Sequence, residues 1–329
     1  MNIVNVTDEK YKDVWDNFLI ASGRGSYFQS WQWGSAMEKS GAEVFRVAVI
    51  DKDENGSAQL RAIMTAWTQK TSLGKEMIVI PQGPILDFMG KDSYSIIAAM
   101  FEHIENIAEE RKIVFSRVSA PILSSEVTYL GSYFASLKKK VKASKKRLTG
   151  EKIYKLSVSP EQHVFPEKFN FNFKNAQDRF EIGSTNDCKE IAFFLNALGG
   201  DREKNNFWPL VAEHINQNPA VVPLGQKTRE LLPLKFFYAT RKGSILAGVV
   251  IIYFGLSATV AYELISPEGV APLYLIHHAI ATDAHDIGLT HCAVEGDKSA
   301  IAEQLGGAKE EMSDTCDIIY RKLWYKLVS

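Results

Sequence analysis

The sequence predicts a mixed α/β protein made of two similar domains in tandem. Short apolar runs alternate with segments of helical periodicity along the whole chain, which is typical of α/β and α+β folds. At 329 residues the chain is longer than one ordinary hydrophobic core supports, and two domains fit that length. The same order of elements also occurs twice, which favours two related domains, each with a mixed sheet flanked by helices.

The first domain is predicted to contain a hairpin followed by a strand, a helix and a strand. Val44–Ile50 and Ala58–Thr68 are apolar runs on either side of Asn55-Gly56, a dipeptide that favours tight hairpin turns. Ser93–Glu110 carries apolar residues at helical spacing and is predicted to be a helix. Strands are predicted before and after it, at Met77–Ile80 and Val114–Val118.

The second domain repeats that order. Helices are predicted at Cys188–Leu198 and Phe207–Asn216, with breaks at Gly199-Gly200 and at Pro209, so no long helical hairpin is expected. A hairpin, a strand, a helix and a strand follow, at Lys235–Ala239 with Leu246–Phe254, Thr259–Ile265, Pro272–Ile287 and Thr290–Ala293. Upstream, alternating phenylalanines by themselves predict a further strand, at Phe169, Phe171 and Phe173.

Composition limits the classes of function. Apolar residues make up 46% of the chain and charged residues 23%, and a formal net charge of −1 leaves any polyanion binding to local patches. Cys188, Cys292 and Cys316 are widely spaced and predict neither a disulfide framework nor a zinc ribbon. The histidines from His277 to His291 lack zinc-site spacing, so no metal is expected. Without a signal-peptide pattern or an apolar run near the roughly 20 residues of a membrane span, a cytoplasmic protein is expected.

Two motifs in the first domain carry a family resemblance. One is Gln29-Ser30-Trp31-Gln32-Trp33-Gly34, within the segment that begins at Tyr27. The other is Pro81-Gln82-Gly83-Pro84-Ile85-Leu86-Asp87, which leaves an apolar strand through a sharp, rigid turn. In this order and at this separation they resemble the Fem (FemABX) family of peptidoglycan interpeptide-bridge aminoacyltransferases. The resemblance extends to Leu327 and includes the turn at Leu305-Gly306-Gly307.

The resemblance implies two tandem N-acetyltransferase-like (GNAT, acyl-CoA N-acyltransferase-like) domains, 1–150 plus 312–329 and 151–311. The last strand, Ile318–Leu327, is expected to return to the first sheet. The implied reaction moves an amino acid from aminoacyl-tRNA to the amine of a peptidoglycan precursor peptide, and it requires no cofactor. The implied acceptor is a UDP-MurNAc-peptide or its lipid-linked form, and the latter would place the protein at the periphery of a membrane. No glycine-rich pyrophosphate loop opens Pro272–Ile287, so an acetyl-CoA site is not expected there.

Three site residues of the first domain come from the two motifs. Asp87 matches an acidic position and is the expected proton acceptor for an attacking amine. A helix or turn cap is the alternative for this aspartate. Trp33 and Gln82 are expected to contact the substrate, although a tryptophan most often only fills the core.

The second domain is expected to supply Lys174, Arg202 and Tyr262 for substrate binding. Arg202 suits a bidentate contact to phosphate or carboxylate, and a surface ion pair is the alternative. The sequence departs from the family pattern where relatives carry basic residues. These departures are Met37, Gln82, Asn170 and Ala302.

A strip of seven basic residues is either a phosphate-binding site for tRNA or a solvated surface segment. It consists of Lys138, Lys139, Lys140, Lys142, Lys145, Lys146 and Arg147. Two other functions stay open beside the transferase. One is a Fem-like protein that binds a precursor without catalysis, and the other is an acyltransferase with another acyl donor. The transferred amino acid and the oligomeric state are not defined by the sequence.

Overall fold

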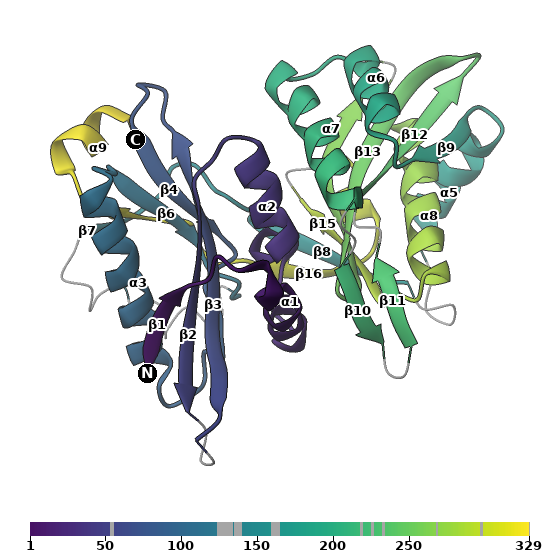
Figure 1. The fold of residues 1–329 in the computed structure, drawn as a ribbon. Coiled ribbons are helices and arrows are strands. Elements are labelled where there is room, and N and C mark those ends of the chain that lie inside the picture. The colour runs from purple at the N-terminus through teal and green to yellow at the C-terminus, as the bar shows by residue number, and fades with distance from the viewer. Residues whose placement is uncertain are drawn as a thin grey trace. The chain divides into compact units, whose positions relative to one another are not determined.

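The computed structural model describes residues 1–52, 56–123, 134, 140–158, 165–217, 220–224, 227–231, 234–267, 269–296 and 299–328. The chain divides into two compact units, each with its own sheet and helices (Figure 1). The first unit consists of Met1–Thr149 and Glu311–Ser329, and the second consists of Gly150–Glu310. The predicted class, mixed sheets flanked by helices, is confirmed.

A mixed eight-stranded sheet forms the core of the first unit. Its strand order is β1-β2-β3-β4-β6-β17-β7, and β5 pairs with β3 off this path. The strands are β1 (Asn2–Asn5), β2 (Val44–Lys52), β3 (Ala58–Lys70), β4 (Glu76–Pro81), β5 (Ile85–Leu86), β6 (Phe115–Ser119), β7 (Lys140–Ala143) and β17 (Cys316–Ile319). β17 returns from the far end of the chain and pairs antiparallel with both β6 and β7. The last strand therefore joins the first sheet, as predicted.

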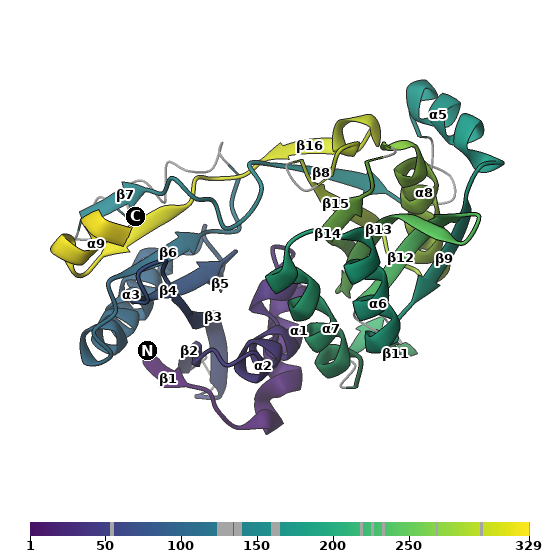
Figure 2. The same cartoon turned by 90° about the horizontal axis from the view of Figure 1, so that it is seen from above.

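Helices cover both faces of this sheet. α1 (Lys12–Ala21) and α2 (Trp31–Lys39) lie on one face, and α3 (Ser93–Glu110) lies on the other (Figures 1 and 2). α3 buries the apolar stripe that the sequence predicts, including Ile97 and Met100. The short helix α9 (Lys322–Val328) follows β17, and two 3-10 turns, η1 (Glu9–Tyr11) and η2 (Tyr27–Gln29), precede α1 and α2.

The second unit is built around a seven-stranded sheet of order β16-β8-β15-β14-β13-β12-β9. Its strands are β8 (Lys152–Ser157), β9 (Glu181–Thr185), β12 (Leu234–Arg241), β13 (Ser244–Phe254), β14 (Ser257–Ile265), β15 (His291–Glu295) and β16 (Ala308–Glu311). A separate hairpin is formed by β10 (Ala220–Leu224) and β11 (Lys227–Leu231). The helices are α5 (Glu167–Gln177), α6 (Cys188–Leu198), α7 (Arg202–Gln217), α8 (Ala271–Asp286) and the 3-10 turn η4 (Ala302–Gln304). α6 and α7 cover one face of the sheet, and α5 and α8 cover the other (Figure 2).

Each unit contains a parallel strand pair joined by a helical crossover. In the first unit β4 and β6 are parallel, and α3 connects them. In the second unit β14 and β15 are parallel, and α8 connects them. A parallel pair requires such a crossover, because the chain must return to the same end of the sheet. The repeated order of elements seen in the sequence is therefore a repeated β-α-β connection.

Three segments differ from the sequence prediction. α7 runs continuously through Pro209, because Trp208, Val211, Ala212 and Ile215 bury one side of it. The alternating phenylalanines lie in a helix, α5, where Phe169 faces the core and Phe171 is 66% exposed. The predicted closing strand Ile318–Leu327 ends at Ile319, and a helix follows.

Candidate functional site

The first motif builds the centre of the first unit around the buried side chain of Gln29. β3 pairs with β5 at Ile63 and with β4 from Trp67 onward, which leaves a gap at Thr65. The Gln29 amide fills it: Nε2 donates to the carbonyls of Thr65 (3.0 Å) and Pro81 (2.8 Å), and Oε1 accepts the Thr65 N–H (2.7 Å). Gln29 thus replaces strand hydrogen bonds that the sheet lacks at this point.

The other residues of this motif also serve the fold. The Ser30 side chain caps α2 by accepting the Trp33 N–H at 3.1 Å. Trp33 is 3% exposed and packs edge-on against Tyr27 and Phe28. A Cβ at Gly34 would lie 2.8 Å from Nη2 of Arg46, so glycine lets that guanidinium cross the helix. The structure therefore places Trp33 in the core, which is the alternative that the sequence left open.

The second motif forms a rigid turn at the carboxyl end of β4. Gln82 adopts a left-handed backbone conformation (φ 49°), which side-chain-bearing residues rarely hold. Two contacts to the end of β6 fix it: the Gln82 N–H donates to Oγ of Ser119 (3.0 Å), and the Gly83 N–H donates to the Ser119 carbonyl (3.1 Å). A Cβ at Gly83 would lie 2.7 Å from the Gln29 amide nitrogen, so the two motifs interlock.

Asp87 follows this turn directly after β5, and its side chain is exposed. Its Oδ1 accepts the Met89 N–H at 3.0 Å, which is the turn cap considered from the sequence. A carboxylate has two oxygens, so this single bond leaves accepting capacity for an amine proton. The geometry is compatible with both roles.

Arg24 is a basic residue at this end of the sheet that sequence reasoning missed. Its Nη1 donates to the carbonyl of Pro121, just after β6, at 3.5 Å, and its guanidinium lies 5.8 Å from the Phe88 ring, just after β5. Gln82, on the adjoining turn, carries no charge. No local pattern in the sequence marks Arg24, because only the tertiary fold brings it to the strand ends.

In the second unit, Tyr262 on β14 lies against the first turns of α7, the helix that begins at Arg202. The Trp208 ring lies 6.2 Å from that of Tyr262, and Nζ of Lys204 lies 5.4 Å from the same ring. Burial raises the pKa of the half-buried Tyr262, while a hydrogen bond from the backbone of Asp201 opposes this shift. Arg202 is exposed and adjoins Asp201 in the chain. The structure thus brings Tyr262 and the Arg202 segment together.

Lys174 does not join them. It is exposed on α5, which packs on α8, whereas Tyr262 faces Trp208 on α7. These helices cover opposite faces of the sheet (Figure 2). Asn170, one turn earlier on α5, donates from its amide to the carbonyl of Phe165 at 2.8 Å. The α5 segment therefore contributes to the local fold, and its cation lies apart from Tyr262 within this unit.

A buried polar cluster lies where β14 separates from β15. β14 carries a bulge at Ala261, at the end of its parallel pairing. Beyond the bulge, Glu263 accepts the Ala300 N–H at 3.0 Å and contacts Nε2 of His277 at 3.2 Å. Oγ of Ser299 lies 3.5 Å from the same histidine nitrogen. A Ser–His–acid catalytic triad uses both ring nitrogens, so this cluster is a structural bridge to the loop after β15.

Two departures from the family pattern lie inside the units. Met37 is 5% exposed on α2, and Ala302 is 2% exposed in η4. A lysine at either position would bury an ammonium group, and the desolvation cost of such a group is on the order of several kcal/mol. The replacements therefore fit the packing of this chain.

The basic strip is divided by the structure. Lys138 and Lys139 lie outside the described residues, as does the side chain of Lys140. Lys142, Lys145 and Lys146 are exposed.

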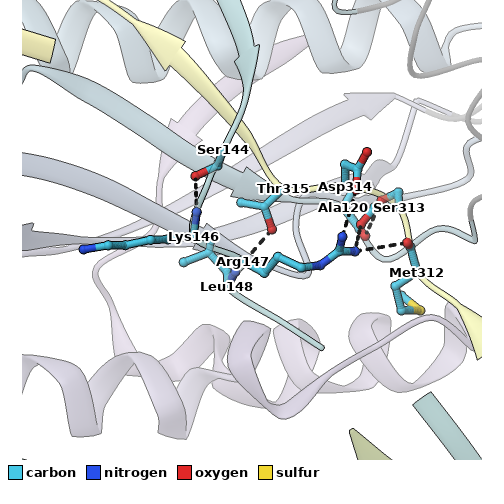
Figure 3. Close-up of polar contacts among 9 residues, drawn as sticks. All are labelled: Ala120, Ser144, Lys146, Arg147, Leu148, Met312, Ser313, Asp314 and Thr315. Atoms are coloured by element: carbon cyan, nitrogen blue, oxygen red, sulfur yellow. Dashed lines mark hydrogen bonds and ion pairs between the residues drawn. The ribbon is translucent and has the colours of Figure 1, made fainter. Parts of the chain in front are cut away.

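Arg147, the last residue of the strip, is a structural anchor. Nη1 of Arg147 contacts Asp314 at 2.8 Å, and Nη2 donates to the carbonyls of Met312 (3.3 Å) and Ser313 (3.1 Å) (Figure 3). The neighbouring Leu148 N–H donates to Oγ1 of Thr315 at 3.2 Å. Arg147 therefore anchors the returning segment that leads into β17, and Lys142, Lys145 and Lys146 are the cations that face solvent among the described side chains of the strip.

No group of three or more His, Cys, Asp or Glu side chains within the described part of the chain is arranged to hold a metal ion. Cys292 is buried, and burial raises the pKa of its thiol to about 12, so it behaves as a core residue. Among the described helices none is long and apolar enough to cross a membrane.

Comparison with known proteins gives a family match for part of the chain and a fold for all of it. Residues 11–149 match the model of the FemAB family. The crystal structure of FemX is similar over 100% of both chains, with a TM-score of 0.73 and 12% identity. A conserved protein of unknown function from Bacteroides thetaiotaomicron VPI-5482 is similar over 97% of this chain and 100% of its own, with a TM-score of 0.61 and 10% identity.

A tandem GNAT protein from the clavulanic acid biosynthesis pathway is similar over 96% of each chain, with a TM-score of 0.56 and 10% identity. No curated protein sequence matches this chain. The resemblance to the Fem family is confirmed by sequence over residues 11–149. The structural matches along the whole chain confirm the GNAT-like fold.

Proposed function

We propose that this Fem-family chain is an aminoacyltransferase that moves an amino acid from aminoacyl-tRNA to the amine of a peptidoglycan precursor peptide. The observation that carries the proposal is the FemAB match over residues 11–149, which contains both interlocked motifs of the first unit. The fold shared with FemX supports it. The two compact units are proposed to be the two domains of the protein, and a cytoplasmic location is part of the proposal.

The chemistry requires positioning and one proton acceptor. The amine nitrogen attacks the ester carbonyl, an amide C–N bond forms, and the ester C–O bond to the ribose breaks. The amine gives up a proton, and the leaving ribose oxygen takes one. Because the ester is already activated, holding amine and ester in attack geometry can supply several kcal/mol of the barrier, on the order seen for oriented reactants.

We assign the proton-accepting role to Asp87. Its carboxylate is exposed, and it is held by one bond to the Met89 N–H at 3.0 Å. The interlock of Gln29 with Gly83 fixes the turn that carries it. Arg24, at the same end of the sheet, supplies a positive charge that Gln82 lacks. In the second unit, Tyr262 and Arg202 are proposed to bind the precursor through a hydroxyl and a guanidinium.

The decisive experiment measures amino-acid transfer from a charged tRNA pool to a UDP-MurNAc-peptide and to its lipid-linked form. Asp87→Asn should abolish transfer and leave precursor affinity nearly unchanged, because an asparagine oxygen still accepts the Met89 N–H but cannot take a proton. Asp92→Asn is the matched control, since Asp92 is an exposed acid in the same loop that contacts Arg61 at 3.7 Å. Equal activity of both variants would remove Asp87 from the mechanism.

A second function is a Fem-like protein that binds the precursor without catalysis. The burial of Met37 and Ala302 favours it, because at these two positions, where the Fem family pattern has a lysine, this chain has a buried apolar side chain that cannot contact a substrate phosphate or stabilise charge. Wild-type protein that binds the precursor but transfers from no aminoacyl-tRNA would select this function. Transfer from an acyl-CoA in the same assay would select the third candidate, an acyltransferase with another donor.

A further inference from the structure

The C-terminal helix α9 presents an apolar stripe to solvent. Leu323, Trp324 and Leu327 are 73%, 39% and 59% exposed. Single exposed apolar side chains are common on protein surfaces, but three on one short helix are not explained by the folding of the first unit.

The orientation of this stripe is fixed by the buried face of the helix. Tyr325 is buried, its hydroxyl donates to Oδ2 of Asp317 at 3.0 Å, and its ring packs edge-on at 5.2 Å from Phe115. Asp317 is itself held by a bidentate contact with Arg117 at 2.8 and 2.9 Å. At about 100° per residue, Leu323 and Leu327 lie about 160° from Tyr325, on the opposite side of the helix, and Trp324 lies on the flank beside them. The fold therefore holds the stripe outward.

Basic residues flank the stripe on both sides. Lys322 and Lys326 are exposed on α9 itself. Nζ of Lys75, in the turn between β3 and β4, lies 4.2 Å from the Trp324 ring. The same turn exposes another apolar side chain, Leu73, at 56%. The sequence from residue 318 to residue 328 contains no Asp or Glu.

We propose that this face, formed by Leu73, Lys75 and α9, docks the protein on an anionic phospholipid surface. Leucine and tryptophan side chains flanked by lysines are typical of segments that bind at a bilayer surface. The apolar groups insert into the headgroup region, and the lysines contact lipid phosphates. Tryptophan is also favoured at the interface between lipid and water. The inference goes beyond the proposed reaction and does not depend on it.

The test is co-sedimentation of the full chain with vesicles of phosphatidylcholine alone and of phosphatidylcholine with an equal amount of phosphatidylglycerol. Wild-type protein should bind the anionic vesicles, and binding should weaken as salt is raised. Lys322→Gln with Lys326→Gln should lower the partition coefficient about 25-fold, since each cation near an anionic membrane surface contributes on the order of a fivefold change. Leu323→Ser with Leu327→Ser should lower it by about tenfold or more.

Matched controls change the same residue types on the second unit. Lys168→Gln with Lys189→Gln removes two exposed charges, and Phe171→Ser with Phe193→Ser removes two side chains that are 66% and 68% exposed. Both controls should bind anionic vesicles as wild type does. Circular dichroism and light scattering on every variant establish folding and oligomeric state.

Three outcomes would overturn the proposal. They are absence of binding to either vesicle, equal binding to neutral and anionic vesicles, and an α9-dependent dimer in solution that shows the stripe to be a protein contact. Loss of vesicle binding in an α9 variant that still transfers to a soluble acceptor would support docking and separate it from the reaction.

Discussion

Asp16→Asn should stabilise the first unit at neutral and alkaline pH. Asp16 is 5% exposed on α1, and its Oδ1 accepts the Trp31 N–H at 2.9 Å. Burial raises the pKa of this carboxyl from its ordinary value of 3.8 to about 7, against the opposing effects of the Trp31 N–H, Lys12 and Gln32. The native protein therefore binds a proton between about pH 4 and pH 7 that the unfolded chain has released, and stability falls as the pH rises through that window. A difference of about 3 pKa units corresponds to about 4 kcal/mol at most.

The assay is urea unfolding followed by tryptophan fluorescence from pH 4 to pH 8. Five of the six tryptophans, including Trp15 and Trp31 next to Asp16, belong to the first unit, so the signal reports mainly on that unit. The free energy of unfolding of Asp16→Asn relative to wild type should grow with pH and level off above about pH 7. Asp13→Asn, an exposed acid on the same helix whose charge makes the smallest contribution to the raised pKa of Asp16, should shift the wild-type curve only slightly. Parallel curves for wild type and Asp16→Asn would refute the reasoning.

Further predictions concern stability and binding. Gln29→Ala should lower the free energy of unfolding of the first unit by about 3 kcal/mol or more, because three buried backbone groups at Thr65 and Pro81 lose their hydrogen-bond partner. A smaller loss in urea unfolding would mean that water replaces the amide. Arg147→Gln should destabilise the same unit and have little effect on the salt dependence of tRNA binding. Neutralising the exposed lysines of the strip should reduce the salt slope of tRNA binding by about one per charge and leave stability unchanged. The reverse pattern, measured by filter binding and urea unfolding, would contradict this assignment. Tyr262→Phe should weaken precursor binding about fivefold to tenfold in calorimetry without unfolding the protein, and unchanged affinity would remove this hydroxyl from the site.

The sequence predicts most elements because their periodicity coincides with their burial. α3 and α6 have the bounds that their apolar spacing predicts, and the two hairpins follow from their turn chemistry. Prediction fails where the local pattern is ambiguous. Phe169 and Phe173 are four residues apart and lie on one helical face, but the phenylalanine between them imitates the period of a strand.

The site shows the same division. The interlock of the two motifs could be anticipated only as a resemblance, because neither Gln29 nor Gly83 indicates its partner more than fifty residues away. Lys174 and Tyr262 both match the family pattern, yet the second sheet separates them onto opposite faces. Arg24 matches no pattern and nevertheless lies at the strand ends.

The sequence by itself determined the mixed α/β class, the repeated order of elements and the resemblance to the Fem family, because apolar period and short motifs are local properties of a chain. Tertiary structure alone decided which motif residues are structural. Gln29 bridges a gap that exists only when β4 and β5 pair with the same strand, and Arg147 finds Asp314 only when the chain returns to the first sheet. Hydrogen bonds between distant segments produce no local pattern in the sequence, because a side chain acquires its partner only when the fold brings the two segments together.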